Sequence, residues 1–431
     1  MATVDQSLAI PRSQPRLISR RALFVLLFVG LTLSWFLGLA VVFWPAVAFF
    51  FLLSFLANRR LEFPRYFGIW LLFLAWVLIS GFGLEDGSGA LVFAQRFFVI
   101  AAATLVFLFV FNSPRSSLPD STVVNALAVY WAILIVGGLA AALAPAISYH
   151  SPAEALVPGG LLSNPYIHGS LHVRFADVQS VLGFPVGRPS IFFTATNAWG
   201  AMVALLTPFA FAALEQATST SRRRLLQGLL VLSIVPIVVS LNRGVWLALG
   251  AAALYVAVRA ALRLNLRSLG YVAGFLGVIA ALLIATPLGT LTSDRLTTPT
   301  DSNQSRGAIY EEAFAGIREA PLLGYSGPKP AQRNPGGPPV GTHSHLLFLA
   351  FSHGVPALLF FLIWIGITLI RSARMSGPPF WAHVAVLVFL VESPYYLLEA
   401  HLVVVMIAAA LVWRLLAAGS PAARARPAAL A

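Results

Sequence analysis

The sequence of 431 residues contains no cysteine and few charged residues. Without cysteine, neither a disulfide framework nor a thiolate metal site is possible. Charged residues make up 10% of the chain and hydrophobic residues 59%, whereas about a quarter of a soluble domain is charged. Apolar runs of about 18 residues or more recur along the chain, each long enough to cross a bilayer. The composition therefore predicts a polytopic helical membrane protein.

Several motifs of phosphate and metal chemistry are also missing. The chain has no D-x-D pair, no Walker-type loop, no G-x-S-x-G elbow and no H-E-x-x-H. A formal charge of +13 would suit nucleic acid, but the basic residues stand in short clusters between apolar runs. That pattern is typical of membrane topology signals, so we expect no nucleic-acid partner. Phosphate chemistry without Mg²⁺ ligands must place its positive charge on side chains.

Twelve spans are expected, within one membrane domain that covers residues 1–431. The first two share one apolar stretch, so a tight hairpin near Gly38 or Pro45 is expected. The predicted spans are residues 22–39, 40–57, 66–84, 90–111, 123–146, 190–213, 224–241, 244–262, 268–289, 344–370, 379–395 and 398–417.

The positions of lysine and arginine predict the orientation. Most of the 28 basic residues fall in tails and short loops of one side, which indicates that both termini are cytoplasmic. The other side carries two long segments, residues 147–189 and 290–343. Long loops of this kind are usually functional or disordered.

The second long segment contains a predicted amphipathic helix that lies over the bundle and ends at Pro321. Its apolar positions recur at helical spacing: Ala308, Ile309, Ala313, Phe314 and Ile317.

Three arginines stand beside spans on the side where positive charge is otherwise avoided. Arg188 precedes the sixth span, with Asn197 about two turns inside that span. Arg243, preceded by Asn242, occupies the turn between spans seven and eight, and Arg306 begins the amphipathic helix. One interpretation of each is a snorkelling interface anchor. Together they favour an anionic ligand at the bilayer surface, since guanidinium groups match phosphate oxygens bidentately.

Three of the eight histidines lie in "GTHSHLLFLAFSHG", residues 341–354. On a helix, His343 and His345 point in different directions, because only i+3 and i+4 neighbours share a face. His353 lies ten residues beyond His343 and is expected to pack inside the bundle. This spacing argues against a metal site here. Two interpretations of His343 remain, a general base at a wet helix end and a polar helix start.

Four stretches resemble signatures of the O-antigen ligase and polymerase superfamily. "GRPSIFFTATNAWG" resembles its arginine, small residues and asparagine, and "SLNRGVWLAL" resembles its Ser-Arg-Gly-x-Trp turn, with Asn242 replacing serine. "SRGAIYEEAFAGIREAPLLGYS" resembles the stretch ending in Pro-Leu-Leu-Gly-Tyr-Gly, with Ser326 replacing the last glycine. His343, Ser344 and Gly354 fit the ligases' His, then Asn, Ser or Gln, nine residues, then Gly. Polymerases more often have His-Asn, which favours a ligase.

The resemblance, over about residues 185–370, implies a GT-C-type fold and a glycosyltransferase in a Gram-negative inner membrane. This enzyme moves O-antigen from undecaprenyl diphosphate to the lipid A–core oligosaccharide, with its site facing the periplasm. The resemblance implies that Arg188 and Arg243, with Arg306 as a third contact, hold the diphosphate without a metal ion or other cofactor. It implies that His343 is the general base of an inverting transfer. Candidate contacts of donor or acceptor are Asn197, Asn242, His345 and Tyr325, and membrane lipids surround the bundle.

Two rival functions remain open. A polymerase would use the same lipid-linked donor, with a growing glycan as its acceptor. A polysaccharide or lipid transporter would keep ionisable residues near the membrane centre and show repeated halves, and the sequence shows neither pattern. In the terminal hairpin, Glu392, Glu399 and His401 are either a second polar contact for the acceptor or ordinary loop residues. The second interpretation is favoured.

Overall fold

The computed structural model describes residues 19–57, 61–84, 87–162, 165–181, 184–264, 266–285, 289–290, 301–333 and 338–418. The chain is a multi-pass membrane protein, and its described residues are mostly helical, with 74% helix and few strands. Among these residues, a helix of 14 to 28 residues overlaps each predicted span. These helices are α1 (Arg20–Phe36), α2 (Ala40–Ala57), α3 (Phe67–Ser80), α4 (Gly87–Asn112), α5 (Asp120–Leu143), α9 (Thr196–Glu215), α10 (Thr220–Val239), α11 (Arg243–Leu262), α12 (Leu266–Ala285), α15 (His345–Ser372), α16 (Pro378–Glu392) and α17 (Leu402–Ala418).

Among the described residues, five helices are long and apolar enough to cross a membrane: α4, α5, α9, α11 and α15. Shorter apolar helices lie at Ala40–Leu56, Phe67–Gly83, Pro378–Glu392 and Leu402–Ala418. That the chain crosses the membrane twelve times stays a prediction, as does the GT-C type.

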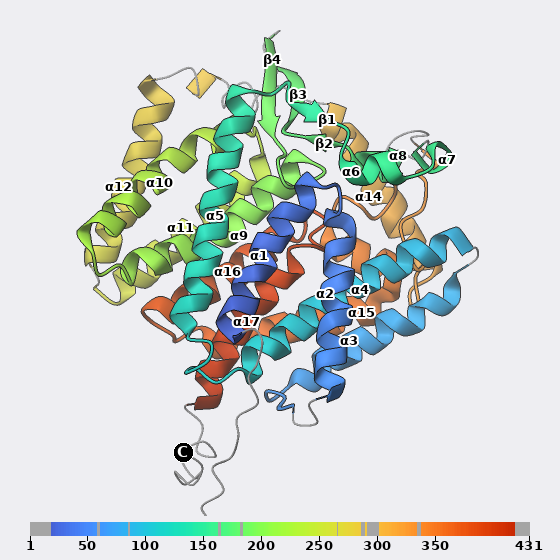
Figure 1. Cartoon of the computed structure of the whole chain (residues 1–431), viewed down its shortest axis with the longest axis horizontal. Coiled ribbons are helices and arrows are strands. Elements are labelled where there is room, and N and C mark those ends of the chain that lie inside the picture. The colour runs from blue at the N-terminus through green and yellow to red at the C-terminus, as the bar shows by residue number, and fades with distance from the viewer. Residues whose placement is uncertain are drawn as a thin grey trace, which may run out of the picture.

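Helices α9 and α17 form the centre of the bundle. In α9, 83% of an 18-residue apolar stretch is buried. In α17, every residue from Leu402 to Arg414 is buried. Both are rich in alanine, whose small side chain lets neighbouring helices approach closely. Helix α9 packs on α5 and α16, and α17 packs on α4 and α16 (Figure 1).

The turn between α1 and α2 is at Gly38, one of the two predicted positions. Gly38 has φ +74°, a left-handed conformation that favours glycine, and an added Cβ would collide with the Ser151 side chain. Pro45, the other predicted position, lies inside α2.

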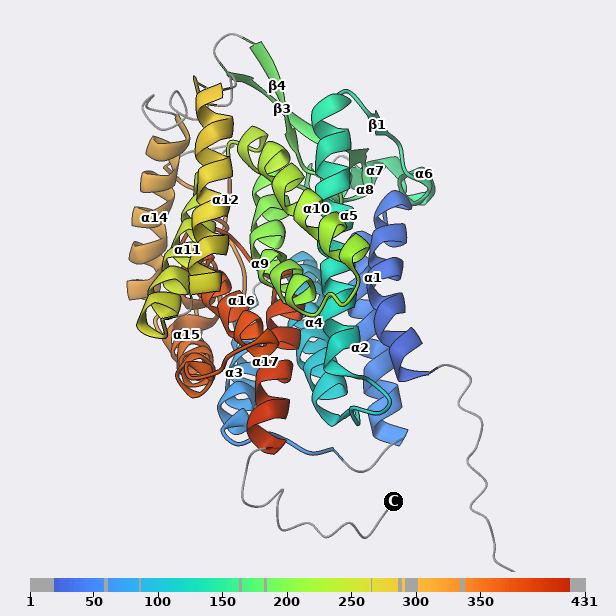
Figure 2. The ribbon, with the colours of Figure 1, turned by 90° about the vertical axis from the view of Figure 1, so that its left-hand side faces the viewer.

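The segment predicted as a long loop at residues 147–189 contains short elements, so the fold is not entirely helical. Strand β1 (Ser148–Tyr149) pairs antiparallel with β2 (Val173–Arg174), and β3 (Ala176–Val181) pairs with β4 (Phe184–Pro189). Between them lie α6 (Pro152–Leu156), α7 (Gly159–Leu162) and α8 (Pro165–Leu171). The β3–β4 hairpin lies at the opposite end of the molecule from the end of α17 (Figure 2).

The predicted amphipathic helix is confirmed as α14 (Asp301–Glu319), which packs against α15. Of its apolar residues, Ile309 and Ala313 are buried, whereas Phe314, which was expected on the same face, is 52% exposed. The helix ends before Pro321, because proline cannot continue the helical hydrogen bonding.

Two predicted spans differ from the helices that replace them. Helix α9 begins at Thr196, whose backbone N–H and hydroxyl both donate to an Asp177 carboxylate oxygen, each at 2.9 Å. The sixth span was predicted to begin at 190, so Asn197 lies in the first turn of α9 and not two turns inside. Helix α15 is kinked at Gly354, which has φ +82°, followed two residues later by Pro356. The sequence analysis predicted a span over residues 344–370 and no kink within it.

Candidate active site

The turn that follows α16 connects several of the predicted site segments. Its first residue, Ser393, accepts hydrogen bonds at its carbonyl oxygen from the His345 N–H at 2.8 Å and from the Ser344 hydroxyl at 3.2 Å. Ser344 also caps α15, because its side chain accepts from the Leu347 N–H at 3.2 Å. The start of α15 is therefore fastened to this turn by both backbone and side chain.

Tyr310 of α14 reaches the same place. Its hydroxyl lies 3.2 Å from the carbonyl oxygen of His343 and 3.1 Å from that of Pro394. The single hydroxyl hydrogen is shared between the two acceptors. The amphipathic helix thus holds the backbone of His343 against the turn.

Tyr396 lies in the same turn, two residues after Pro394, and its hydroxyl donates to the side-chain oxygen of Asn242. Arg243 begins α11 immediately after that asparagine. Gly244 lies so close to the ring of Tyr396 that an added Cβ would collide with it. The turn that contains Arg243 and Gly244 therefore packs directly against the residues that follow α16.

Arg188 joins this group from β4. Its Nε donates to the carbonyl oxygen of Ser240 at 2.7 Å, two residues before Asn242. The contacts run from Arg188 through the turn at 240–243 and the turn at 393–396 to His343. Of the four residues predicted for catalysis and diphosphate binding, Arg188 and the backbone of His343 take part in this contact series, and Arg243 follows Asn242 directly in the chain.

The three histidines of residues 341–354 have different surroundings, as their spacing predicted. The His343 ring is half-buried, with Nδ1 3.1 Å from the Thr342 hydroxyl. His345 is only 1% exposed and packs against Phe361 and Phe389. Its ring nitrogens have no hydrogen-bond partner in the described part of the chain. His353 is buried, with Nδ1 2.7 Å from the Ser80 hydroxyl.

The remaining predicted site residues lie around this region. Arg306 stands in α14, but its side chain lies outside the described residues. The Tyr325 hydroxyl donates to a Glu319 carboxylate oxygen at 2.9 Å, and its ring packs on Phe351. Asn242 is 2% exposed, and its side-chain nitrogen has no hydrogen-bond partner within the described ranges. This nitrogen is therefore an available hydrogen-bond donor, buried in the turn that precedes Arg243.

Sequence reasoning missed Arg96, which lies within α4. Its Nη1 is 3.6 Å from Glu399 Oε2, and its guanidinium lies 5.0 Å from the centre of the Phe348 ring. Arg96 is the one charged residue in the predicted span 90–111. An ionisable residue within a span is a functional candidate by default, so this signal was present in the sequence.

Arg96 and Glu399 line a cleft of about 260 Å³. His401 also lines it, and its Nε2 lies 2.9 Å from the carbonyl oxygen of Ala198 in α9. Glu392 is not in a loop: it ends α16, fully buried, with no hydrogen-bond partner for its carboxylate among the described residues. The cleft walls include the aromatic residues Trp35, Trp44, Tyr130, Phe192 and Phe193.

A larger cavity, of about 440 Å³, is lined by Arg259 and Arg263 at the other end of α11. None of the predicted site residues lines it. Its size therefore does not argue that it is the active site.

Comparison with known proteins gives one match. Residues 228–362 match a family model described as O-antigen ligase. The matched region includes Arg243, His343 and Gly354, whereas Arg188 and Asn197 precede it. Searches of curated proteins and of solved structures found no match.

Proposed function

We propose that this chain, a member of the O-antigen ligase family, transfers O-antigen polysaccharide from undecaprenyl diphosphate to the lipid A–core oligosaccharide. The observation that carries the proposal is the contact series that runs from Arg188 to the turn before Arg243 and on through the turn at 393–396 to the backbone of His343. In this proposal the site faces the periplasm of a Gram-negative inner membrane. Both termini are cytoplasmic, and the apolar bundle surrounds the polyprenyl tail.

In the proposed mechanism, Arg188 and Arg243 bind the diphosphate oxygens of the donor, with Arg306 as a third contact. Guanidinium groups remain charged at any physiological pH and form paired hydrogen bonds with phosphate oxygens. Negative charge grows on the diphosphate as the glycosidic bond breaks. Fixed positive charge at that place stabilises the transition state more than the ground state.

His343 is the proposed general base. It takes the proton from an acceptor hydroxyl as the hydroxyl oxygen attacks the anomeric carbon. The bond between that carbon and the phosphate oxygen breaks, and its electron pair leaves with undecaprenyl diphosphate. Attack from the face opposite the leaving group inverts the anomeric configuration. In this mechanism Asn242 donates a hydrogen bond to the donor, and Asn197, His345 and Tyr325 belong to the surrounding contacts.

A polymerase that uses the same donor is the second candidate. The position that favoured a ligase is Ser344, where polymerases more often have asparagine, and here it caps α15. Serine and asparagine are equally good helix caps, so this position has a structural role that both enzymes share. The two functions differ in the acceptor, which has to be identified by experiment.

The test uses purified full-length protein in vesicles with lipid-linked glycan and lipid A–core, in buffer without Mg²⁺. Glycan attached to the core, lost in His343→Ala, is the result expected for a ligase. Longer lipid-linked glycan with unmodified core would replace this proposal by the polymerase. A strict requirement for added Mg²⁺ would contradict the assignment of the leaving-group charge to arginines.

A further inference from the structure

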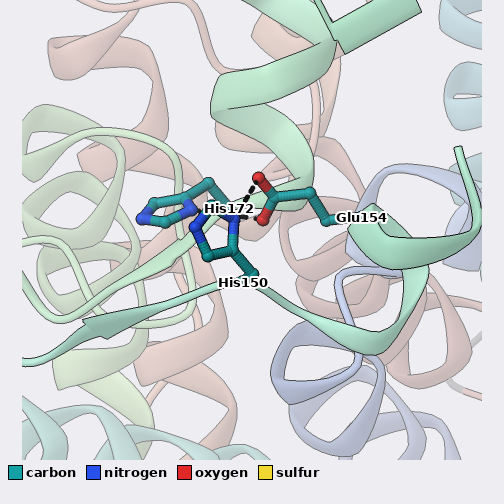
Figure 3. Close-up of side chains that lie close together, drawn as sticks. All are labelled: His150, Glu154 and His172. Atoms are coloured by element: carbon teal, nitrogen blue, oxygen red, sulfur yellow. Dashed lines mark hydrogen bonds and ion pairs between the residues drawn. The ribbon is translucent and has the colours of Figure 1, made fainter. Parts of the chain in front are cut away.

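Away from the candidate active site, three histidines surround one carboxylate in the segment 147–189. Nδ1 of His150 lies 2.9 Å from Oε1 of Glu154, and Nδ1 of His172 lies 3.1 Å from Oε2 (Figure 3). Nε2 of His168 lies 3.4 Å from the same Oε1. These residues come from the end of β1, from α6, from α8 and from the connection between α8 and β2.

The rings are packed closely around the carboxylate. The centres of the His150 and His172 rings are 5.0 Å apart, and those of His168 and His172 are 5.3 Å apart. One ligand atom from each of His150, Glu154 and His172 lies within 4.8 Å of the other two. The three rings therefore form one cluster around the carboxylate.

Glu154 is the central group, and its side chain is only 4% exposed. Each of its two oxygens lies within hydrogen-bond distance of an imidazole nitrogen, Oε1 of His150 Nδ1 and Oε2 of His172 Nδ1. A buried carboxylate requires paired or coordinating partners, and the three histidines converge on it.

We propose that His150, Glu154, His168 and His172 bind one Zn²⁺ ion. Imidazole nitrogens and a carboxylate oxygen are zinc ligands, at about 2.0–2.2 Å from the ion, and four of them complete a tetrahedral structural site. The chain has no cysteine, so this donor set does not favour metals that prefer thiolates. The side chains of His150 and His168 are 79% and 47% exposed, so an ion in solution can reach both rings.

The proposed ion would stabilise the position of segment 147–189 on the helical bundle. The Tyr149 hydroxyl donates to the carbonyl oxygen of Phe36 at 3.0 Å, and the Ala153 N–H donates to that of Leu37 at 3.1 Å. Both contacts hold the segment on the α1–α2 turn. His172 also lines the cleft that contains Arg96 and Glu399. The ion therefore has a structural role at the edge of that cleft, separate from the proposed transfer chemistry.

The experiment is a metal analysis of full-length protein that carries no histidine tag, purified in detergent. After chelator treatment and dialysis against Zn²⁺, the expected result is one Zn²⁺ per chain and a higher unfolding temperature. His172→Ala and Glu154→Gln are each expected to lower the zinc affinity by at least about tenfold, since even outer-shell changes have effects of that size. Glu311→Gln alters an exposed carboxylate of α14 and is the matched control, expected to bind like the wild type.

A second measurement covers variants that fail to fold. Titration of the wild-type protein with Co²⁺ is expected to give the visible absorption of a tetrahedral site, and Zn²⁺ is expected to abolish it. Wild-type protein without stoichiometric zinc would overturn the proposal. Equal zinc binding by wild type, His172→Ala and Glu154→Gln would overturn it too, because the ion would then lie elsewhere.

Discussion

Replacing Tyr310 with phenylalanine removes the hydroxyl that lies between the carbonyl oxygens of His343 and Pro394. A net hydrogen bond contributes about 0.5–1.5 kcal/mol, and a buried acceptor left without a donor costs about 1–3 kcal/mol. Because one hydroxyl hydrogen serves two acceptors here, we take about 1–2 kcal/mol for holding His343 in place. That free energy corresponds to about a 5- to 30-fold decrease in the productive population.

The assay is steady-state transfer with reconstituted protein. Tyr310→Phe is expected to lower kcat by about 5- to 30-fold, with little change in KM for the donor, because the contacts of Arg188 and Arg243 remain. The control is Tyr255→Phe, which removes a hydroxyl 2.7 Å from His383 Nε2, further along α11 from Arg243. Wild-type kcat in Tyr310→Phe, or an equal decrease in both variants, would refute the positioning role of Tyr310.

Three further predictions concern the arginines, the kink and the ion pair. Arg188→Ala and Arg243→Ala are each expected to lower kcat/KM for the donor by about 10²–10³-fold, as seen on removing one charge-stabilising donor; steady-state kinetics measures this. Gly354→Ala forces φ +82° on a residue with a Cβ and is expected to destabilise the fold by at least about 1–3 kcal/mol, measured by denaturant unfolding. Arg96→Ala and Glu399→Gln are expected to show a coupling free energy of about 0.5–3 kcal/mol in a double-mutant cycle of unfolding.

Each of these predictions has a contradicting result. Wild-type kinetics in either arginine variant would remove that residue from the diphosphate site. Gly354→Ala with wild-type stability would mean that the kink tolerates a side chain. Additive effects of Arg96→Ala and Glu399→Gln would show that their 3.6 Å contact contributes nothing to stability.

Hydropathy predicted the helices well, because each one needs a long apolar run regardless of its neighbours. The sequence failed where local geometry depends on distant partners. The start of α9 is set by Asp177, which binds Thr196 from β3. The kink in α15 is set at Gly354, where an added Cβ would collide with the backbone of Leu322. In the sequence, Asp177 is far from Thr196, and Leu322 is far from Gly354.

The candidate site, too, could be predicted from the sequence only in part. The resemblance predicts Arg188, Arg243 and His343 as site residues, which stays a prediction, whereas Tyr310 and Tyr396, which connect their segments, carry no motif of their own. The proposed zinc site did have a sequence signal. His150 and Glu154 are four residues apart, as are His168 and His172, so three histidines and one glutamate stand within 23 residues of the sequence.

The central claim is that His343 acts on the acceptor while Arg188 and Arg243 hold the donor. The measurement that tests it most directly compares donor binding and single-turnover transfer in one preparation of His343→Ala. Transfer is expected to fall by about 10²–10⁴-fold, while the protein binds lipid-linked glycan as the wild type does. Transfer at the wild-type rate in this variant would contradict the account.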